Sequence, residues 1–213
     1  MGSRLRPEGK RKGQTPASDP GVTGAGVMHL RYPPAKRVAI LSDTHGQLDP
    51  RIAELVAGCD CAVDAGDIGG AGVLAALRPK DPLVAVRGNN DLPAKWPPDQ
   101  HSLLHGLPEE AGLSLPGGEL LVLHGHRAGP VRSRHQWLRD RYPQARVLVY
   151  GHSHRLVCDL SARPRVLNPG AAGRARTYGG PSCLLPAISD RQWMVREIRF
   201  EPIPKSRSQG RSD

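Results

Sequence analysis

The sequence has no long hydrophobic run, few aromatic residues and few cysteines. No apolar stretch approaches the roughly 20 residues that a helix needs to cross a bilayer, so we expect no membrane partner. Aromatic residues make up 4% of the 213 residues, whereas glycine and proline are frequent, at 25 and 21 residues. This composition is typical of a loop-rich globular protein and excludes a coiled coil. The first 26 residues contain no apolar core of a secretory signal, so the sequence predicts a cytoplasmic protein.

The cysteines exclude a metal-binding finger. Cys59, Cys61, Cys158 and Cys183 form no C-x-x-C pair and have no finger spacing. We therefore expect reduced thiols, most of them buried. Any metal ion in this protein would be held by other side chains.

Positive charge is concentrated at the two ends of the chain. The formal net charge is +10. Residues 1–37 contain eight basic and two acidic residues and so contribute +6 of this charge. Residues 203–213 carry three basic residues and one acidic residue, which leaves +2 for the rest. We expect one domain at 36–202, with disordered basic tails at 1–35 and 203–213. Solvated tails are the simpler interpretation, and tails that bring nucleic acid to the protein are the alternative.

Short apolar runs alternate with helix-like stretches in the first half of the domain. We expect strands at 37–41, 61–67 and 83–89, and helices at 48–58 and 72–78. The resulting βαβαβ order predicts a largely parallel sheet.

The pattern changes after about residue 100. We expect buried strands at 120–126 and 146–154, with an amphipathic helix at 130–143 that is opened by Pro130. Four short strands follow in close succession, which suggests antiparallel pairs. The sequence therefore predicts an α/β protein with two sheets and outer helices.

Five of the apolar runs end in side chains that bind metal ions. In order, these ends are Asp43-x-His45, Gly66-Asp67, Gly88-Asn89-Asn90-Asp91, His124-Gly125-His126 and Gly151-His152-Ser153-His154. In an open α/β sheet, ligands bind beyond the carboxyl ends of the strands. Residues i and i+2 of an extended segment point to the same side. Each D-x-H or H-x-H pair can therefore present two ligands to one point.

The ligand types suit two divalent transition-metal ions. Asp, His and Asn without Cys favour Mn, Fe, Zn, Ni or Co. Seven ligands are too many for one ion, and two ions that share a carboxylate would use them all. Two ions about 3.5–4 Å apart are the usual arrangement for displacement at phosphorus.

The series D-x-H, G-D, G-N-x-D, H-G-H and G-H-x-H, in this order, resembles the calcineurin-like metallophosphoesterase superfamily. Within it, the chain is most similar to the small bacterial and archaeal phosphodiesterases. The resemblance runs from about residue 37 to 200 and includes the N-P-G segment at 168–170. It implies a two-sheet sandwich flanked by helices (αββα). It also implies a phosphodiesterase with two divalent ions, Mn first among them, that acts on a small phosphodiester substrate.

Matched residue by residue, the resemblance implies a role for each ligand. Asp43, His45 and His154 would hold one ion, Asn89, His124 and His152 would hold the other, and Asp67 would bridge them. A hydroxide between the ions would attack phosphorus, so Asp67 and Asn89 are also predicted to be catalytic.

Residues beside these motifs are candidates for substrate contacts. Asn90 replaces a His that, in many superfamily members, is thought to protonate the leaving group. An amide cannot do this, and general acid catalysis is typically worth about 10²–10⁴-fold. His126 either contacts substrate or is structural. Arginine side chains suit phosphate groups, so we also consider the candidates Arg127, Arg155, Arg174 and Arg176. Of the last two, Arg174 is preferred to Arg176. For each of them, a solvent-exposed surface charge is the alternative.

Two other functions remain as alternatives to the enzyme. One is a non-catalytic scaffold for protein–protein interaction, as in the related retromer subunit, whose ligands are degraded. Here all seven ligand positions are filled. The other is a nuclease recruited by the basic tails. The natural substrate and the oligomeric state are left open.

Overall fold

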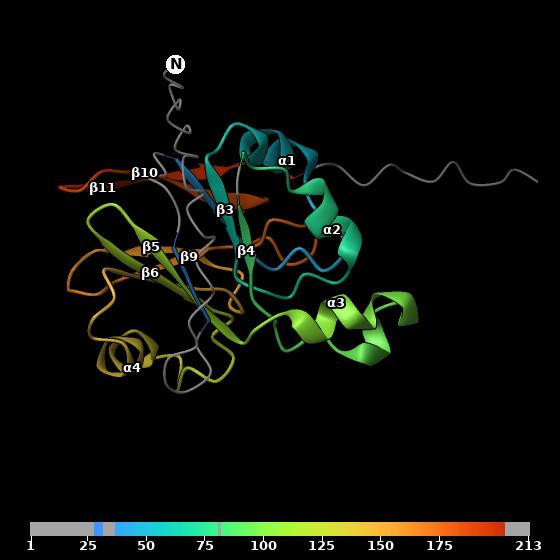
Figure 1. Ribbon diagram of the computed structural model, residues 1–213, viewed down its shortest axis with the longest axis horizontal. Helices are drawn as coiled ribbons and strands as arrows, with labels where there is room; N and C mark the ends of the chain where they lie inside the picture. Colours follow the sequence, from blue (N-terminus) through green and yellow to red (C-terminus); the bar gives the residue numbers. More distant parts are fainter. Residues whose placement is uncertain (1–27, 32–36, 81, 203–213) are drawn as a thin grey trace, which may run out of the picture.

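The computed structural model describes residues 28–31, 37–80 and 82–202, which form two β-sheets packed face to face (Figure 1). The five-stranded sheet has the order β11-β10-β2-β3-β4. Its strands are β2 (Val38–Leu41), β3 (Cys61–Asp64), β4 (Leu83–Ala85), β10 (Ser182–Ile188) and β11 (Trp193–Arg199). The six-stranded sheet has the order β1-β5-β6-β7-β9-β8. Its strands are β1 (Met28–Arg31), β5 (Glu110–Leu115), β6 (Gly118–Leu123), β7 (Val147–Tyr150), β8 (Leu156–Asp159) and β9 (Arg165–Pro169).

Helices cover the outer face of each sheet. They are α1 (Pro50–Ala57), α2 (Ala71–Ala76), α3 (His101–Gly106) and α4 (Arg134–Arg141), with short 3₁₀ turns at Pro93–Lys95 and Pro98–Gln100. Apolar residues of α1, α2 and α3 pack on one face of the five-stranded sheet, whereas Leu138 of α4 packs on the six-stranded sheet. Figure 1 shows α1 and α2 beside β3 and β4, with α4 near β5 and β6. The predicted αββα sandwich is confirmed.

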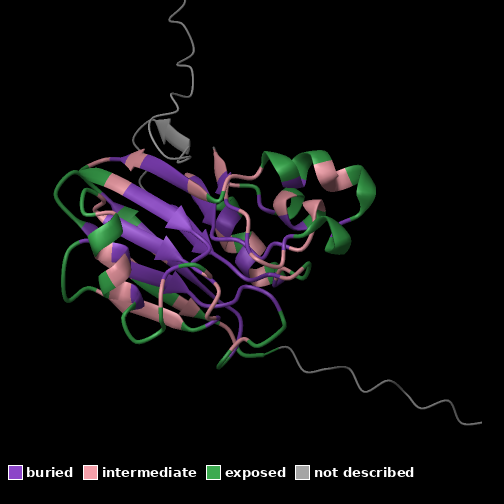
Figure 2. Cartoon of the chain, turned by 90° about the horizontal axis from the view of Figure 1, so that it is seen from below, coloured by how far each residue is buried: buried purple, intermediate pink, exposed green. Residues whose placement is uncertain are grey.

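The main core lies between the two sheets. Val63 of one sheet and Val122 and Val149 of the other belong to the same buried cluster. Figure 2 shows the buried residues concentrated in the central strands. All residues of β2, β3 and β7 are buried, as expected of strands covered on both faces. None of the helices in the described part of the chain is long and apolar enough to cross a membrane.

The predicted βαβαβ unit is confirmed. β2 pairs in parallel with β3, and β3 pairs in parallel with β4. The connecting helix α1 starts where Asp49 accepts a hydrogen bond from the backbone N–H of Arg51 and Pro50 occupies the first turn, and it ends at Gly58. Because the three strands are parallel, their carboxyl ends meet at one edge of the sheet.

Three expectations about elements need correction. The helix expected at 130–143 starts at Arg134, because residues 130–133 form a turn closed by a hydrogen bond from Ser133 N to Pro130 O. Strand β5 and helix α3 were not predicted at all. β1 lies within the expected 1–35 tail and pairs in parallel with β5, so this short segment belongs to the sheet. The rest of both expected tails lies outside the described residues.

Candidate metal centre

The predicted ligands lie in loops just beyond the carboxyl ends of strands from both sheets. Asp43, His45, Asp67 and Asn89 follow strands of the five-stranded sheet, and His124, His152 and His154 follow strands of the six-stranded sheet. Backbone hydrogen bonds join the first two loops, from Asp43 N to Gly66 O and from His45 N to Asp67 O, each of 2.9 Å. The site is therefore assembled where the two layers of the sandwich meet.

Left-handed turns, and not extended strands, orient most of the ligands. Asp43, His45, Asp67, His152 and His154 all have φ between 48° and 65°. The expectation that these residues lie in extended segments is wrong, although Asp43 and His45 do present ligand atoms to one point, as predicted. Each left-handed non-glycine residue costs about 1–2 kcal/mol, and strain of this kind clusters at functional sites.

Close approach of two loops also requires glycine at position 88. A Cβ atom on Gly88 would lie 2.2 Å from Oδ1 and 2.3 Å from the backbone N of Asp67. No such contact is sterically allowed, so only glycine lets the loop after β4 pack against Asp67.

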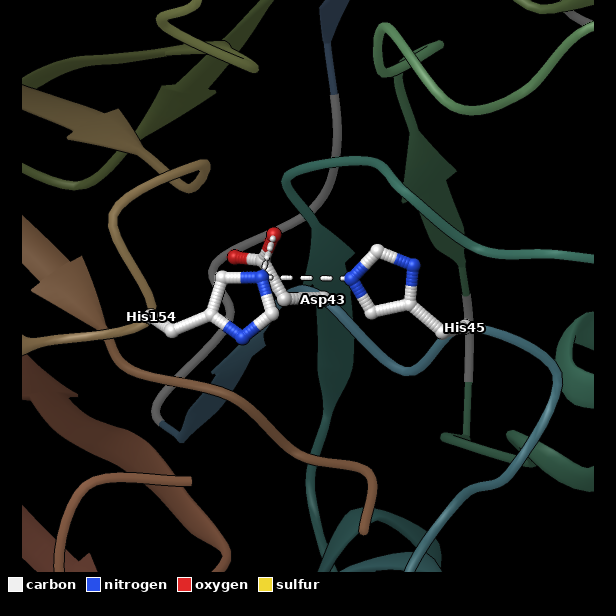
Figure 3. A group of neighbouring side chains, drawn as sticks. All are labelled: Asp43, His45 and His154. Atoms are coloured by element: carbon white, nitrogen blue, oxygen red, sulfur yellow. Dashed lines mark hydrogen bonds and ion pairs between the residues drawn. The ribbon is translucent and has the colours of Figure 1, made fainter. Parts of the chain in front are cut away.

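The first ligand group consists of Asp43, His45 and His154 (Figure 3). Nε2 of His154 lies 3.2 Å from Nε2 of His45 and 3.2 Å from Oδ1 of Asp43. The three ligand atoms lie within 4.8 Å of one another. The structure therefore brings together the three residues predicted to hold the first ion.

The second ligand group includes Asp67 and shares Asp43 with the first group. Asp43, Asp67 and His124 offer ligand atoms within 4.8 Å of one another. Oδ2 of Asp67 lies 3.4 Å from Nε2 of His124 and 3.8 Å from Nε2 of His45. Nδ1 of His152 lies 3.0 Å from Oδ1 of Asn89, and the rings of His152 and His124 meet edge to face at 5.4 Å. Asp67 thus lies beside His45 of one predicted ion site and His124 of the other.

Unpartnered buried atoms show that the side chains fit a cation. Oδ1 of Asp43 and Nε2 of His124 are buried and have no hydrogen-bond partner among the described residues. Leaving such atoms unsatisfied costs about 1–3 kcal/mol each. Carboxylate oxygens and imidazole nitrogens are good ligands for divalent transition metals, so these residues would hold such an ion.

The charge state of the cluster is set by burial and by neighbouring charges. Burial lowers the pKa of His45 and of His152. Burial opposes the charged form of His124 as well, but the carboxylate of Asp67 outweighs it and raises the pKa of His124. For Asp67, burial would raise the pKa, yet His124 and two hydrogen bonds from Asn90 hold the pKa well below its usual range. Asp67 is therefore ionised and ready to hold a cation.

The buried carboxylate of Asp91, which the sequence analysis did not single out, connects the loop after β3 to the loop after β4. Asp91 accepts hydrogen bonds from the backbone N–H groups of Gly88 (2.8 Å), Gly69 (2.9 Å) and Ile68 (3.1 Å) and from the indole of Trp96 (3.2 Å). In the sequence, this residue is the final Asp of the G-N-x-D motif, and its place in that motif could have marked it. Asn168 of the N-P-G segment is also buried, and its side chain donates a hydrogen bond to Gly151 O at 2.7 Å. It thereby connects this segment to the loop after β7.

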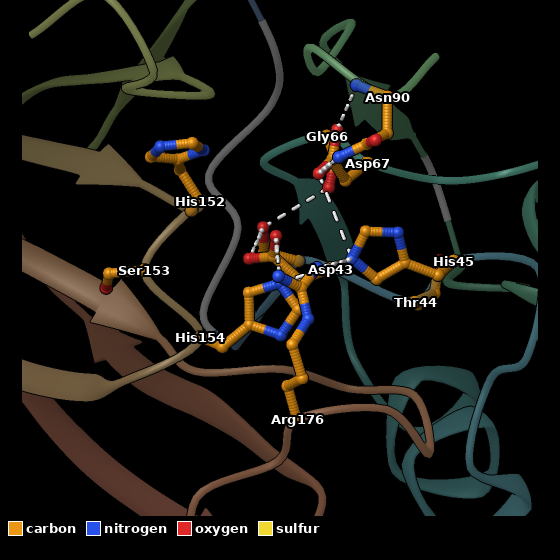
Figure 4. A network of polar contacts seen from close by, with 12 residues as sticks. Asp43, Thr44, His45, Gly66, Asp67, Asn90, His152, Ser153, His154 and Arg176 are labelled. Atoms are coloured by element: carbon orange, nitrogen blue, oxygen red, sulfur yellow. Dashed lines mark hydrogen bonds and ion pairs between the residues drawn. The ribbon is translucent and has the colours of Figure 1, made fainter.

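The predicted substrate contacts have different surroundings. Asn90 is turned onto Asp67, and Arg127 pairs with Glu109 at 2.6 Å. The guanidinium of Arg155 stacks on the Tyr178 ring at 4.5 Å. Half-buried His126 lies 5.7 Å from the ring of His124, and Arg174 is exposed. The structure instead brings Arg176 to the site, where its Nη2 lies 3.3 Å from Nε2 of His45 (Figure 4).

Comparison with known proteins identifies the family. Residues 37–191 match the model of the calcineurin-like phosphoesterase superfamily domain. The chain belongs to this superfamily. No curated protein matches the chain in sequence.

Solved structures share the calcineurin-like phosphoesterase fold with this chain. Wild-type Vps29 from Entamoeba histolytica, complexed with Zn²⁺, is 17% identical, with a TM-score of 0.59 over 78% of this chain and 99% of that chain. A predicted phosphoesterase from Streptococcus pneumoniae is 24% identical, with a TM-score of 0.56 over 81% and 95%. A novel archaeal phosphodiesterase is 20% identical, with a TM-score of 0.57 over 77% and 99%. At these identities the similarity shows the fold alone.

As a calcineurin-like phosphoesterase, the protein belongs to a family that binds divalent metals, and it presents two candidate ligand groups for them. The ligand roles, the number of ions and the metal itself stay predictions.

Proposed function

We propose that this protein is a phosphodiesterase that depends on two divalent metal ions, with Mn²⁺ as the first candidate. The observation that carries the proposal is the position of Asp67, whose Oδ2 lies 3.8 Å from Nε2 of His45 and 3.4 Å from Nε2 of His124. A carboxylate that lies beside a histidine of each predicted ion site suits the bridging position of a two-ion site.

The proposed division of ligands is the one that the resemblance to the superfamily implies. Asp43, His45 and His154 would hold one ion, Asn89, His124 and His152 would hold the other, and Asp67 would serve both. When bound, the ions supply a nucleophilic hydroxide at neutral pH and offset the charge of the phosphoryl group.

The surroundings of Asn90 support a preference for substrates with good leaving groups. Its amide donates to Asp67 and its Oδ1 accepts from Nζ of Lys95, so all of its polar atoms are engaged. No imidazole stands at this position to protonate a departing alkoxide. We therefore expect activated diesters, such as nitrophenyl esters, to be hydrolysed much faster than alkyl diesters.

Turnover of bis(p-nitrophenyl) phosphate tests the proposal. We expect hydrolysis with Mn²⁺, none with EDTA, and none by Asp67→Ala. Asp99→Asn, which removes an exposed carboxylate from the Pro98–Gln100 turn, is the matched control and should be as active as the wild type. A wild-type protein that binds metal yet hydrolyses no ester in a broad panel would contradict the proposal and favour the scaffold function.

A further inference from the structure

Arg176 holds a guanidinium against the first ligand group. It lies in the loop between β9 and β10, and its Nη2 is 3.3 Å from Nε2 of His45. This is the same imidazole nitrogen that faces His154 at 3.2 Å. Figure 4 shows the Arg176 side chain reaching over this edge of the cluster. The guanidinium is therefore beside an atom that is predicted to ligate metal.

The backbone of Arg176 shares an unusual conformation with the ligands. Six non-glycine residues of the described chain have positive φ, and five of them are predicted ligands. The sixth is Arg176, with φ of 55°. A left-handed arginine costs about 1–2 kcal/mol, and such strain persists only where the surrounding structure imposes it. The loop thus holds Arg176 in place as the other loops hold the ligands.

The positive charge of Arg176 is not matched by a carboxylate. Other arginines near this edge form ion pairs, Arg51 with Asp49 at 2.8 Å and Arg127 with Glu109 at 2.6 Å. None of the ion pairs found in the described residues includes Arg176. Its guanidinium is exposed and remains available to an anion from solution.

The charges beside His45 determine what kind of group the Arg176 guanidinium would bind. A guanidinium is always positive, and a cation held by His45 would add charge of the same sign beside it. An anion that contacts both relieves this repulsion. A phosphoryl group offers oxygens that match the planar donor fork of arginine.

We propose that Arg176 contacts a non-bridging phosphoryl oxygen of the substrate, on the side of the Asp43, His45 and His154 group. The nature of the reaction rests on the proposed function, but the binding of a phosphoryl anion by Arg176 can be measured without turnover. The position two residues earlier, Arg174, has no contact with a ligand side chain in the described residues and would not share this role.

Binding of inorganic phosphate to the Mn²⁺-loaded protein, followed by calorimetry, tests the proposal. We expect Arg176→Ala to weaken phosphate binding at least tenfold, and to lower kcat/KM for bis(p-nitrophenyl) phosphate about 10–100-fold. Arg176→Lys keeps the positive charge but loses the planar arrangement of N–H donors. Its phosphate affinity and its kcat/KM should therefore lie between those of Arg176→Ala and the wild type. Neither variant should bind Mn²⁺ more weakly than the wild type, because Arg176 is not a ligand and its positive charge opposes a cation at His45.

Arg191→Ala is the matched control. It removes the same charge from the exposed turn between β10 and β11, at the end of the sheet away from the ligands, and should bind phosphate like the wild type. Equal phosphate binding by Arg176→Ala and the wild type would overturn the proposal, and so would a loss of Mn²⁺ binding in Arg176→Ala. Phosphate binding that depends on Arg176, without turnover by the wild type, would uphold this inference and refute the proposed function.

Discussion

Asn90 donates two hydrogen bonds to Asp67, from its backbone N to Oδ1 and from its side-chain Nδ2 to Oδ2, each of 2.7 Å. Both oxygens of the carboxylate are thereby held by one residue, and Oδ2 also faces Nε2 of His124 and Nε2 of His45. The residue that replaces a histidine at this position thus orients the carboxylate beside His124 and His45.

Substitutions at Asn90 should weaken metal binding through Asp67. Asn90→Ala removes the side-chain donor, and we expect Mn²⁺ affinity to fall about tenfold, the lower end for residues that orient a ligand. Asn90→Asp removes the donor and adds a charge that repels Asp67, so its loss should be larger. Calorimetric titration with Mn²⁺ measures both variants. If Asn90→Ala bound Mn²⁺ as tightly as the wild type, orientation by this hydrogen bond would not be the cause.

Removal of metal should lower thermal stability. A ligand at 100 times its dissociation constant stabilises the folded state by about 2.7 kcal/mol, which for a chain of this size raises Tm by about 5–10 °C. We expect EDTA to reverse this rise in the wild type. His154→Ala, which removes one member of the first group, should show a smaller rise. Differential scanning calorimetry with and without Mn²⁺ gives the comparison, and an identical rise in His154→Ala would exclude His154 as a ligand.

Asp91→Ala should be among the most destabilising single substitutions near the site. It leaves the N–H groups of Gly69 and Gly88 and the indole of Trp96 without a buried acceptor. Each loss costs about 1–3 kcal/mol, so we expect a drop of about 3 kcal/mol or more in the free energy of unfolding. Urea denaturation measures it, with Asp140→Ala on the exposed face of α4 as the control. A drop below about 1 kcal/mol would show that the loops do not depend on this carboxylate.

Asp159 should make stability depend on acid pH. Burial opposes its charged form, but hydrogen bonds from Ser161, Arg139 and His135 lower its pKa below the usual range. Its contribution is therefore complete above the unfolded pKa of about 3.9 and is lost as pH falls towards the lower folded pKa. We expect Asp159→Asn to destabilise the protein by about 1.5–3 kcal/mol at pH 7 and by less at pH 3, where part of the contribution has been lost. Denaturant unfolding at both pH values tests this, and a difference that does not shrink in acid would contradict the pKa shift.

The four thiols should resist alkylation in the folded protein. Burial raises the pKa of Cys183 to about 12, and burial with the carboxylate of Glu197 raises the pKa of Cys158 to about 12. Because the thiolate is the reactive form, iodoacetamide at pH 8 should label the native protein very slowly and label all four thiols in urea. Ala94→Cys, at an exposed position, gives the positive control. Rapid native labelling of one thiol would show that this thiol is accessible.

Sequence patterns were sufficient to predict that these side chains gather at one edge of the sandwich, and to predict the parallel sheet that carries half of them. Strands such as β2 and β3 are continuous apolar runs, and the polar residue that ends each run marks the loop. The left-handed turns at Asp43 and His45 were not predictable from their spacing, because the loop that carries them is hydrogen-bonded to residues 66–68, which are distant in sequence.

The roles of Asp91 and Arg176 depend on contacts between distant segments, and this explains why sequence reasoning undervalued them. Asp91 joins the loop after β4 to the loop after β3, and Arg176 reaches a residue 131 positions away in the chain. Arg174 and Arg176 are equivalent as sequence, and only the turn of the backbone between them separates their surroundings.

Because the predicted ligands are divided between the two sheets, neither sheet alone carries the complete predicted set. Asp43 and Asp67 precede residue 107, whereas His124 and His154 follow it. A chain cut in the α3–β5 connection would yield two fragments with incomplete sets, so full metal affinity would return only when the fragments reassociate. Metal affinity would then measure whether the two fragments have assembled, and fragment pairs that complement each other could be selected by their metal binding.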